Sequence, residues 1–152
     1  MEADRIDNEV VSGGMFRRVL VGFDGSEQAQ RALRVARSLA VDLRGEVHVL
    51  LVVRPPAHSE TSEGREDAIE AERRNLSQGL ADEVSREGRD STPVSHFVVD
   101  GNPAEAIARY AKEHGFDLVV VGTHGRAHGM HPGVGHSLEL LLRHHSCPVL
   151  VV

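Results

Sequence analysis

The sequence predicts an α/β fold, in which a parallel β-sheet is covered by helices on both faces. Five short apolar runs alternate along the chain with stretches in which apolar residues recur at three- and four-residue steps. The central apolar runs are continuous, as expected of strands that are buried on both faces. Each strand–helix unit spans about 30 residues, which suits a right-handed βαβ crossover. Together, these observations favour the parallel arrangement.

Composition and charge narrow the class of protein. Residues 1–15 are polar and include a Gly-Gly pair, so we expect a flexible leader before a single domain at 16–152. No run of about 18 apolar residues and no signal-peptide pattern occurs, and one cysteine, Cys147, suits a reducing compartment. We therefore expect a cytoplasmic protein with no membrane contact. The formal net charge of -6 argues against general nucleic-acid binding.

Each predicted strand is a run of apolar or β-branched residues that ends at a turn. The first contains Val19, Leu20 and Val21, and the last is the short run that follows Pro148. Because a helical stretch separates each strand from the next, all strands are expected to be parallel. The predicted strands span 18–23, 46–53, 93–101, 117–122 and 148–152.

The predicted helices are marked by apolar stripes and by capping residues. The first is capped by Ser26 and closed by Gly45. A polar loop with two prolines, 54–67, is expected before the second. The third begins with Asn102 as the N-cap and Pro103 in the first turn, the preferred place for each residue. The predicted helices span 26–44, 68–88, 102–115 and 136–146.

A candidate site lies where two predicted strands end. Open parallel sheets bind ligands at the carboxyl ends of strands, where the strand order reverses. Asp24 directly follows the first strand, and a loop at 122–137, with five glycines and four histidines, follows the fourth. If these strands are neighbours, Asp24 faces the loop across a crevice. Glycines allow close approach, and the helix that starts near His136 offers free N–H groups, so the loop suits a phosphate chain or is a plain surface loop.

Three segments of the chain resemble the universal stress protein family: 17–40, 98–126 and 140–152. The resemblance implies a five-stranded sheet in the order 3-2-1-4-5, a Rossmann-like fold similar to that of the adenine nucleotide alpha hydrolases. It also implies a regulatory role in the stress response and a homodimer that forms through the last strand, 148–152. In a monomer, that strand would be an unpaired edge.

Members of this family that bind ATP carry a glycine motif in the fourth loop. Gly122, Gly125 and Gly135 match its three glycines. His136 stands where the motif has Ser or Thr, and Ser137 comes one place later. The resemblance implies that ATP, with or without Mg²⁺, binds in the crevice. The residues implied at the nucleotide are Asp24, Val52, Val121, Gly122, His124, Gly125, Arg126, Gly135, His136 and Ser137.

The resemblance also implies roles for some of these residues. Asp24 would face the ribose or the adenine, and Val52 would line the adenine pocket. Charge complementarity to a triphosphate is poorer than in the family pattern, because Arg126 is the only permanent cation in the loop sequence. His128 and His131 would be mostly neutral at pH 7 if their pKa values stay near ~6.5.

Other functions stay open. The chain could be a family member that has lost ATP binding and acts as a dimeric interaction module. The loop could respond to pH, or bind Zn, Ni or Cu, although its spacing matches no fixed metal motif. Catalysis is expected to reach weak ATP hydrolysis at most, because no nucleophile with a base is evident. The histidines of the metal alternative are His124, His128, His131 and His136.

Overall fold

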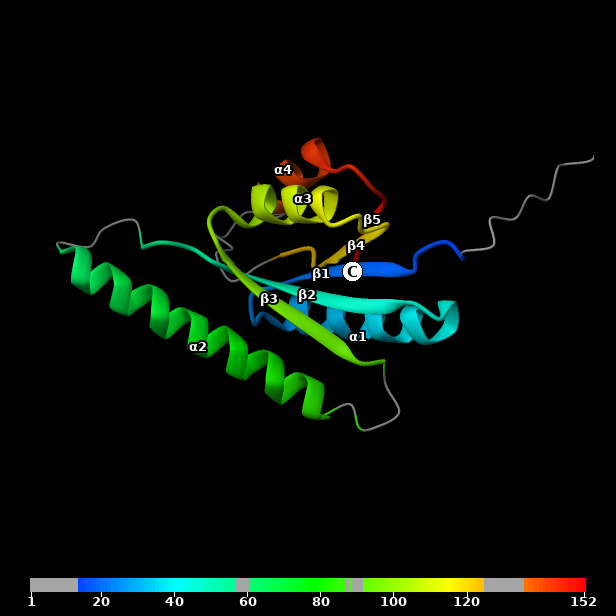
Figure 1. Ribbon diagram of the computed structural model, residues 1–152, viewed down its shortest axis with the longest axis horizontal. Helices are drawn as coiled ribbons and strands as arrows, with labels where there is room; N and C mark the ends of the chain where they lie inside the picture. Colours follow the sequence, from blue (N-terminus) through cyan, green and yellow to red (C-terminus); the bar gives the residue numbers. More distant parts are fainter. Residues whose placement is uncertain (1–13, 57–60, 87, 89–91, 125–135) are drawn as a thin grey trace, which may run out of the picture.

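The computed structural model shows a five-stranded sheet in the order β3-β2-β1-β4-β5 (Figure 1). Every neighbouring pair of strands is parallel. The predicted fold class and the strand order implied by the resemblance are therefore confirmed. Most of the expected leader lies outside the described residues. The structure describes residues 14–56, 61–86, 88, 92–124 and 136–152, and at residue 136 it describes the backbone alone.

The strands match their predicted bounds within one residue, and most helices do so within two. The strands are β1 (Arg18–Phe23), β2 (Glu46–Val53), β3 (Val94–Asp100), β4 (Leu118–Val121) and β5 (Val149–Val151). The helices are α1 (Glu27–Leu43), α2 (Ser62–Arg86), α3 (Pro103–Glu113) and α4 (His136–His144). The exception is the start of α2.

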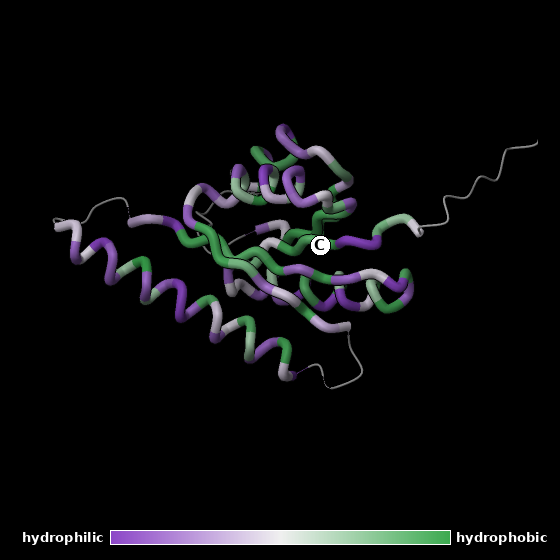
Figure 2. Tube along the Cα trace, in the orientation of Figure 1, coloured by the Kyte–Doolittle hydropathy of each residue, from purple (hydrophilic) through white to green (hydrophobic). Residues whose placement is uncertain are grey.

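Helices cover both faces of the sheet, with α1 and α2 on one face and α3 and α4 on the other (Figure 1). Side chains alternate between the two faces along each strand. On β1, Val19 and Val21 belong to the core under α1 and α2, whereas Leu20 belongs to the core under α3. The central strands are therefore mostly apolar on both faces, and Figure 2 shows them green along most of their length, with polar residues near the amino ends of β1 and β2.

The start of α1 matches the prediction, but its end has a different cause. Ser26 Oγ accepts a hydrogen bond from the N–H of Ala29 at 3.1 Å, which confirms the cap. At the other end, Arg44 takes the left-handed conformation, with φ of 54°. Gly45 serves another need, because a Cβ there would lie 3.0 Å from the carbonyl oxygen of Arg17. It lets the chain before β1 pass close to the end of α1.

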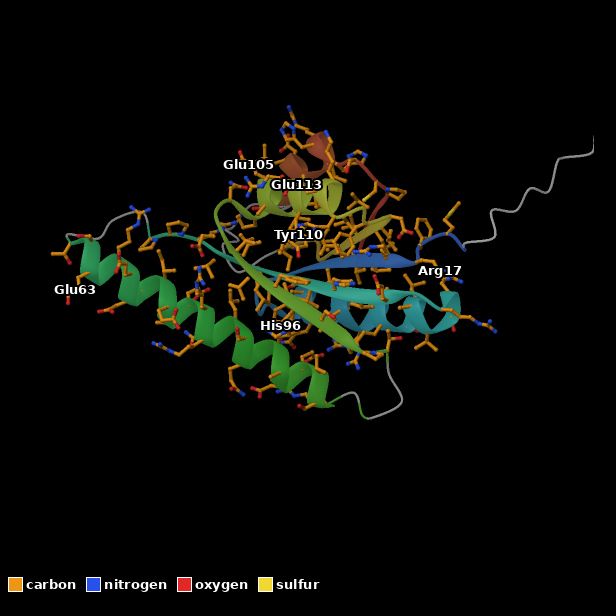
Figure 3. All side chains as sticks on the ribbon, in the orientation of Figure 1. Arg17, Glu63, His96, Glu105, Tyr110 and Glu113 are labelled. Carbon is orange, nitrogen blue, oxygen red and sulfur yellow. The ribbon has the colours of Figure 1, made fainter. Side chains whose placement is uncertain are left out.

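The segment 62–67, predicted as a loop, is the first part of α2. Thr61 Oγ1 accepts a hydrogen bond from the N–H of Gly64 at 3.1 Å and so caps the first turn. All residues of this segment are exposed, and Glu63 lies far from the sheet (Figure 3). A helical segment without a buried side has no apolar period, so the sequence pattern could not reveal it.

The rest of α2 packs on the sheet through a narrow stripe of buried side chains. Leu76 and Leu80 are buried, and so is Glu83 on the same side. Glu83 pairs with Arg34 of α1 and with Arg86 of its own helix, so its charge is compensated. Within the described parts of the chain, no helix combines the length and the apolar character needed to cross a bilayer.

The start of α3 confirms the predicted cap. Asn102 Oδ1 accepts hydrogen bonds from the N–H groups of Ala104 and Glu105, at 3.0 and 3.3 Å. Pro103, which has no N–H to satisfy, is the first helical residue. Further along, Tyr110 lies on the side of α3 that faces the sheet (Figure 3). The hydrogen bonds of Asn102 fix the start of α3 at the carboxyl ends of β2 and β3.

Below the last turns of α3 lies an aromatic cluster, toward the amino ends of the strands. The Tyr110 ring centroid is 4.1 Å from that of His114 and 5.9 Å from that of Phe116. Burial raises the pKa of the Tyr110 hydroxyl, and the positive charge of Arg18 partly offsets the rise. The cluster consists of His48, Phe97, Tyr110, His114 and Phe116.

Candidate functional site

The ends of β1 and β4 lie side by side. β1 pairs with β2 on one side and with β4 on the other, where Val21 stands opposite Val120. The strand order reverses here, because the chain runs outward from β1 to β3 and then returns to β4. Asp24, which follows β1, and Gly122, which follows β4, therefore share the carboxyl edge of the sheet. The adjacency on which the candidate crevice depended is confirmed.

Asp24 shapes the turn between β1 and α1. Its Oδ1 accepts a hydrogen bond from the N–H of Ser26 at 3.0 Å. Gly25, between them, has φ of 80°, a conformation that favours glycine. A half-buried carboxylate is thus held in place at the reversal point. Carboxylate oxygens accept several hydrogen bonds each, so Asp24 can also accept one from a ligand hydroxyl.

Gly122 is pressed against the first turn of α1. A Cβ here would lie 2.6 Å from Gln28 Cβ and 2.9 Å from the carbonyl carbon of Gln28. Helix packing alone therefore requires a glycine, a reason that the sequence did not reveal. The next residue, Thr123, donates its N–H to the carbonyl oxygen of Val152 at 3.2 Å. Its hydroxyl pairs with Nδ1 of the half-buried His124 at 2.9 Å.

The two valines of the candidate site lie on the face covered by α3 and α4. Val52 and Val121 belong to that core and are 8% and 7% exposed. On β1, a Cβ at Gly22 would lie 2.6 Å from Ile107 Cδ1, so α3 already occupies the space above this strand. The valines therefore offer a ligand only a small apolar surface, close to the ends of their strands.

An arginine that the sequence analysis missed also lies at the carboxyl edge of the sheet. Arg54 directly follows β2, and its Nη2 donates a hydrogen bond to Ser137 Oγ, in the first turn of α4, at 3.0 Å. A permanent cation thus lies at the amino end of α4, where the helix dipole also favours the binding of an anion. The signal was available, because Arg54 follows a buried strand directly, as Asp24 does.

The middle of the glycine–histidine loop lies outside the described residues. The backbone of His136 begins α4, whereas nothing is described of its side chain. Among the side chains that the structure describes, no group of His, Cys, Asp and Glu is arranged to hold a metal ion. The predicted site residues that fall outside are Gly125, Arg126, His128, His131 and Gly135.

Known proteins share this architecture. The model of the universal stress protein family matches residues 15–152. The chain belongs to this family. This universal stress protein is 32% identical over 141 residues to a universal stress protein of Thermus aquaticus, with 91% of this chain and 99% of the relative covered. It is 27% identical to the universal stress protein YxiE of Bacillus subtilis, with the same coverage of 91% and 99%.

Solved structures of the family are similar to this universal stress protein over nearly the whole domain. UspA of Lactobacillus plantarum has a TM-score of 0.83 at 23% identity, with 91% of this chain and 98% of that chain covered. A universal stress protein of Burkholderia pseudomallei has a TM-score of 0.71 at 28% identity, with 92% and 98% covered. The likeness to the first shows the fold alone.

Proposed function

We propose that this universal stress protein is a stress-response regulator that binds an adenine nucleotide, ATP, at the carboxyl edge between β1 and β4. The observation that carries the proposal is the placement of Asp24 and Gly122 together where the strand order reverses. Arg54, which also follows a strand at this edge, reaches the start of α4. Open parallel sheets bind their ligands at this kind of point.

Different described residues are suited to different parts of the nucleotide. Asp24 accepts hydrogen bonds from ribose hydroxyls, and the phosphates lie near the first turn of α4. Ser137 offers a hydroxyl there, one place after the position of the family motif. Arg54 is already hydrogen-bonded to it at 3.0 Å and adds a positive charge. That charge offsets the shortage of cations in the neighbouring loop.

Two solved relatives guide the choice of ligands to test. One universal stress protein was solved in complex with cAMP, and one from Archaeoglobus fulgidus in complex with dAMP. They are 22% and 21% identical to this chain, so their likeness to it concerns the fold. We therefore include both nucleotides beside ATP in the first binding experiment.

The purified chain is expected to carry an adenine nucleotide or to take up added ATP. Because it has no Trp and one Tyr, bound adenine should stand out in its absorption spectrum. The denatured supernatant is then analysed by chromatography, and melting is followed with ATP, with and without Mg²⁺. Ligand at a hundred times its Kd should stabilise the fold by about 2.7 kcal/mol. A bare chain whose melting does not respond to millimolar nucleotide would refute the proposal.

A matched pair of variants locates the site. Asp24→Asn keeps an oxygen that can accept the N–H of Ser26, so the turn survives while the negative charge is lost. We expect it to bind ATP about tenfold more weakly, because hydrogen bonds to charged groups are the stronger ones. Asp42→Asn, on the exposed side of α1, should bind as the wild type does. Equal affinity in both variants would place the nucleotide elsewhere.

We also propose that the chain forms a homodimer through β5, at 148–152. Val152 directs both its N–H and its C=O at β4, so the backbone groups of Val149 and Val151 point the other way. No described residue of the chain pairs with that outer side. Val151 is 37% exposed and Leu142 of α4 is 40% exposed. An open apolar edge is a template for a second strand.

Val151→Pro tests the dimer without touching the pairing of β5 with β4. The ring removes the outward N–H alone, a change that edge strands tolerate in a folded monomer. We expect the wild type and Val151→Thr, which keeps this N–H, to sediment as dimers and Val151→Pro to sediment as a monomer. A monomeric wild type, or a Val151→Pro variant that stays dimeric, would contradict the proposed interface.

A further inference from the structure

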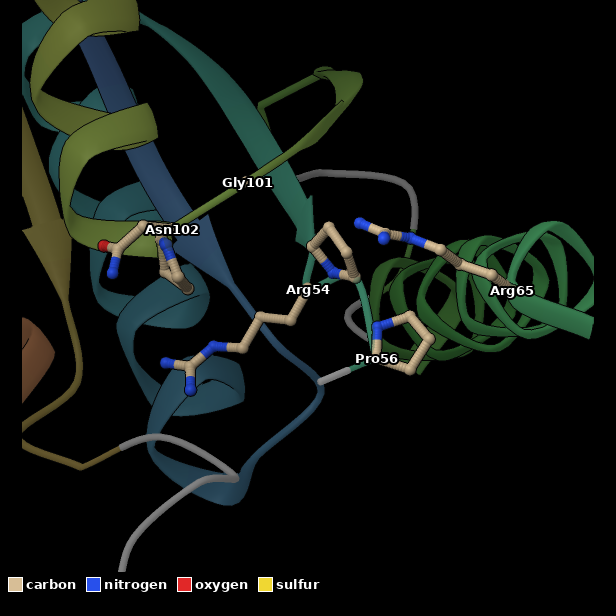
Figure 4. Close-up of a pocket in the computed structure, with 7 residues that line it drawn as sticks. Arg54, Pro56, Arg65, Gly101 and Asn102 are labelled. Carbon is tan, nitrogen blue, oxygen red and sulfur yellow. The ribbon is translucent and has the colours of Figure 1, made fainter. Parts of the chain in front are cut away.

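A pocket of about 520 Å³ opens beside the carboxyl ends of β2 and β3 (Figure 4). Its walls come from Pro55 and Pro56 after β2, from residues 101–103 at the start of α3, and from Arg54 and Arg65. The volume falls within the range of small-molecule sites, about 300–1,000 Å³. Nothing in the proposed nucleotide site explains why a second arginine, from α2, reaches this hollow.

Arg54 and Arg65 differ from Arg73 and Arg74 of α2, which pair with carboxylates. Arg73 bonds to both carboxylate oxygens of Asp100, and Arg74 pairs with Glu70. Among the described residues, no carboxylate forms an ion pair with Arg54 or Arg65. A protein with a net charge of -6 thus lines one pocket with two arginines that have no carboxylate partner among the described residues.

The side chains approach the pocket from different directions. Figure 4 shows Arg65 extending from α2 across the proline turn toward Gly101, whereas Arg54 extends on the other side, past Asn102. The start of α3 does not add free donors, because Asn102 already caps its first N–H groups. The positive charge of the pocket therefore comes from the guanidinium groups.

We propose that this pocket binds the phosphate group of a small molecule. The guanidinium of Arg65 can donate paired hydrogen bonds to the phosphate, and Arg54, whose Nη2 is held at Ser137 Oγ, adds positive charge from the other side of the pocket. The rings of Pro55 and Pro56 give a rigid apolar wall for the organic part of the ligand. The site is separate from the proposed nucleotide site, although Arg54 adjoins both through its bond to Ser137. Binding here does not depend on ATP.

Arg65 is the residue to change, because Arg54 also contacts Ser137. Inorganic phosphate and glycerol 3-phosphate are titrated calorimetrically into the full chain, into Arg65→Gln and into Arg74→Gln. Arg74 lies about two and a half turns further along α2, on the opposite side of the helix, and so controls for the lost charge. Circular dichroism confirms that each variant is folded. We expect Arg65→Gln to lose at least about tenfold in affinity and Arg74→Gln to keep it.

The outcomes separate this inference from the nucleotide proposal. Phosphate binding that requires Arg65 supports the pocket, even if the chain takes up no ATP. A wild type that does not bind millimolar phosphate overturns it. It is also overturned if Arg65→Gln and Arg74→Gln weaken binding equally, or if Arg65→Gln leaves it unchanged. In the last case, competition by ATP would show that phosphate occupies the nucleotide site instead.

Discussion

Gly122→Ala is expected to lower the free energy of unfolding by about 1–3 kcal/mol, the usual cost of forcing an extra group into a packed interior. The new methyl group would meet Gln28 Cβ at 2.6 Å and the carbonyl carbon of Gln28 at 2.9 Å. Backbone at the first turn of α1 cannot move aside as a flexible side chain can. Urea unfolding followed by circular dichroism measures the loss.

Gly79→Ala is the matched control for this change. Gly79 lies inside α2 and has no atom within 4 Å of its added Cβ, so alanine should stabilise the helix by about 0.5–1 kcal/mol. The same substitution is thus expected to have opposite signs at the two positions. If Gly122→Ala kept the stability of the wild type and lost nucleotide binding alone, close approach of a ligand would explain the glycine better than helix packing.

Leu33→Ala is expected to cost about 2–5 kcal/mol of stability, the range for removing a large side chain from a rigid core. Leu33 of α1 is fully buried, in the core that α1 and α2 form against the sheet. Truncation removes apolar contacts and leaves a cavity that the strands cannot close. Thermal or urea unfolding checks the value, and the variant should melt well below the wild type.

Leu43→Ala makes the same chemical change at the end of the same helix. Leu43 is 36% exposed, so it loses less buried area, and alanine is a good helix former. We expect its effect to be well below that of Leu33→Ala. Similar losses at both positions would mean that α1 melts as a unit and that burial of Leu33 does not determine the cost.

Much of this fold could be predicted from local signals. β1 and β2 carry apolar residues on both of their faces, because helices cover both faces of the sheet. Ser26 and Asn102 act as caps through bonds that span two or three residues, which a sequence displays directly. The start of α2 could not be seen, because residues 62–67 bury nothing and so carry no apolar period.

The candidate site was predictable to the extent that topology decides it. Asp24 and Gly122 meet because β1 and β4 are neighbours, which the alternation of strands and helices made natural. The packing of Gly122 on Gln28 and the reach of Arg54 to Ser137 join residues far apart in the chain. No local pattern records such contacts, so only the three-dimensional arrangement reveals them.

The aromatic cluster supplies a natural optical probe. Tyr110 is the chain's one tyrosine, and no tryptophan masks its emission. Its ring sits among His114 and Phe116 toward the amino ends of the strands, at the other edge of the sheet from Asp24. Tyrosine fluorescence therefore registers when α3 separates from the sheet and is remote from events at Asp24. Unfolding, read from tyrosine fluorescence, and bound nucleotide, read from adenine absorption, can therefore be followed in one unlabelled sample as two independent signals.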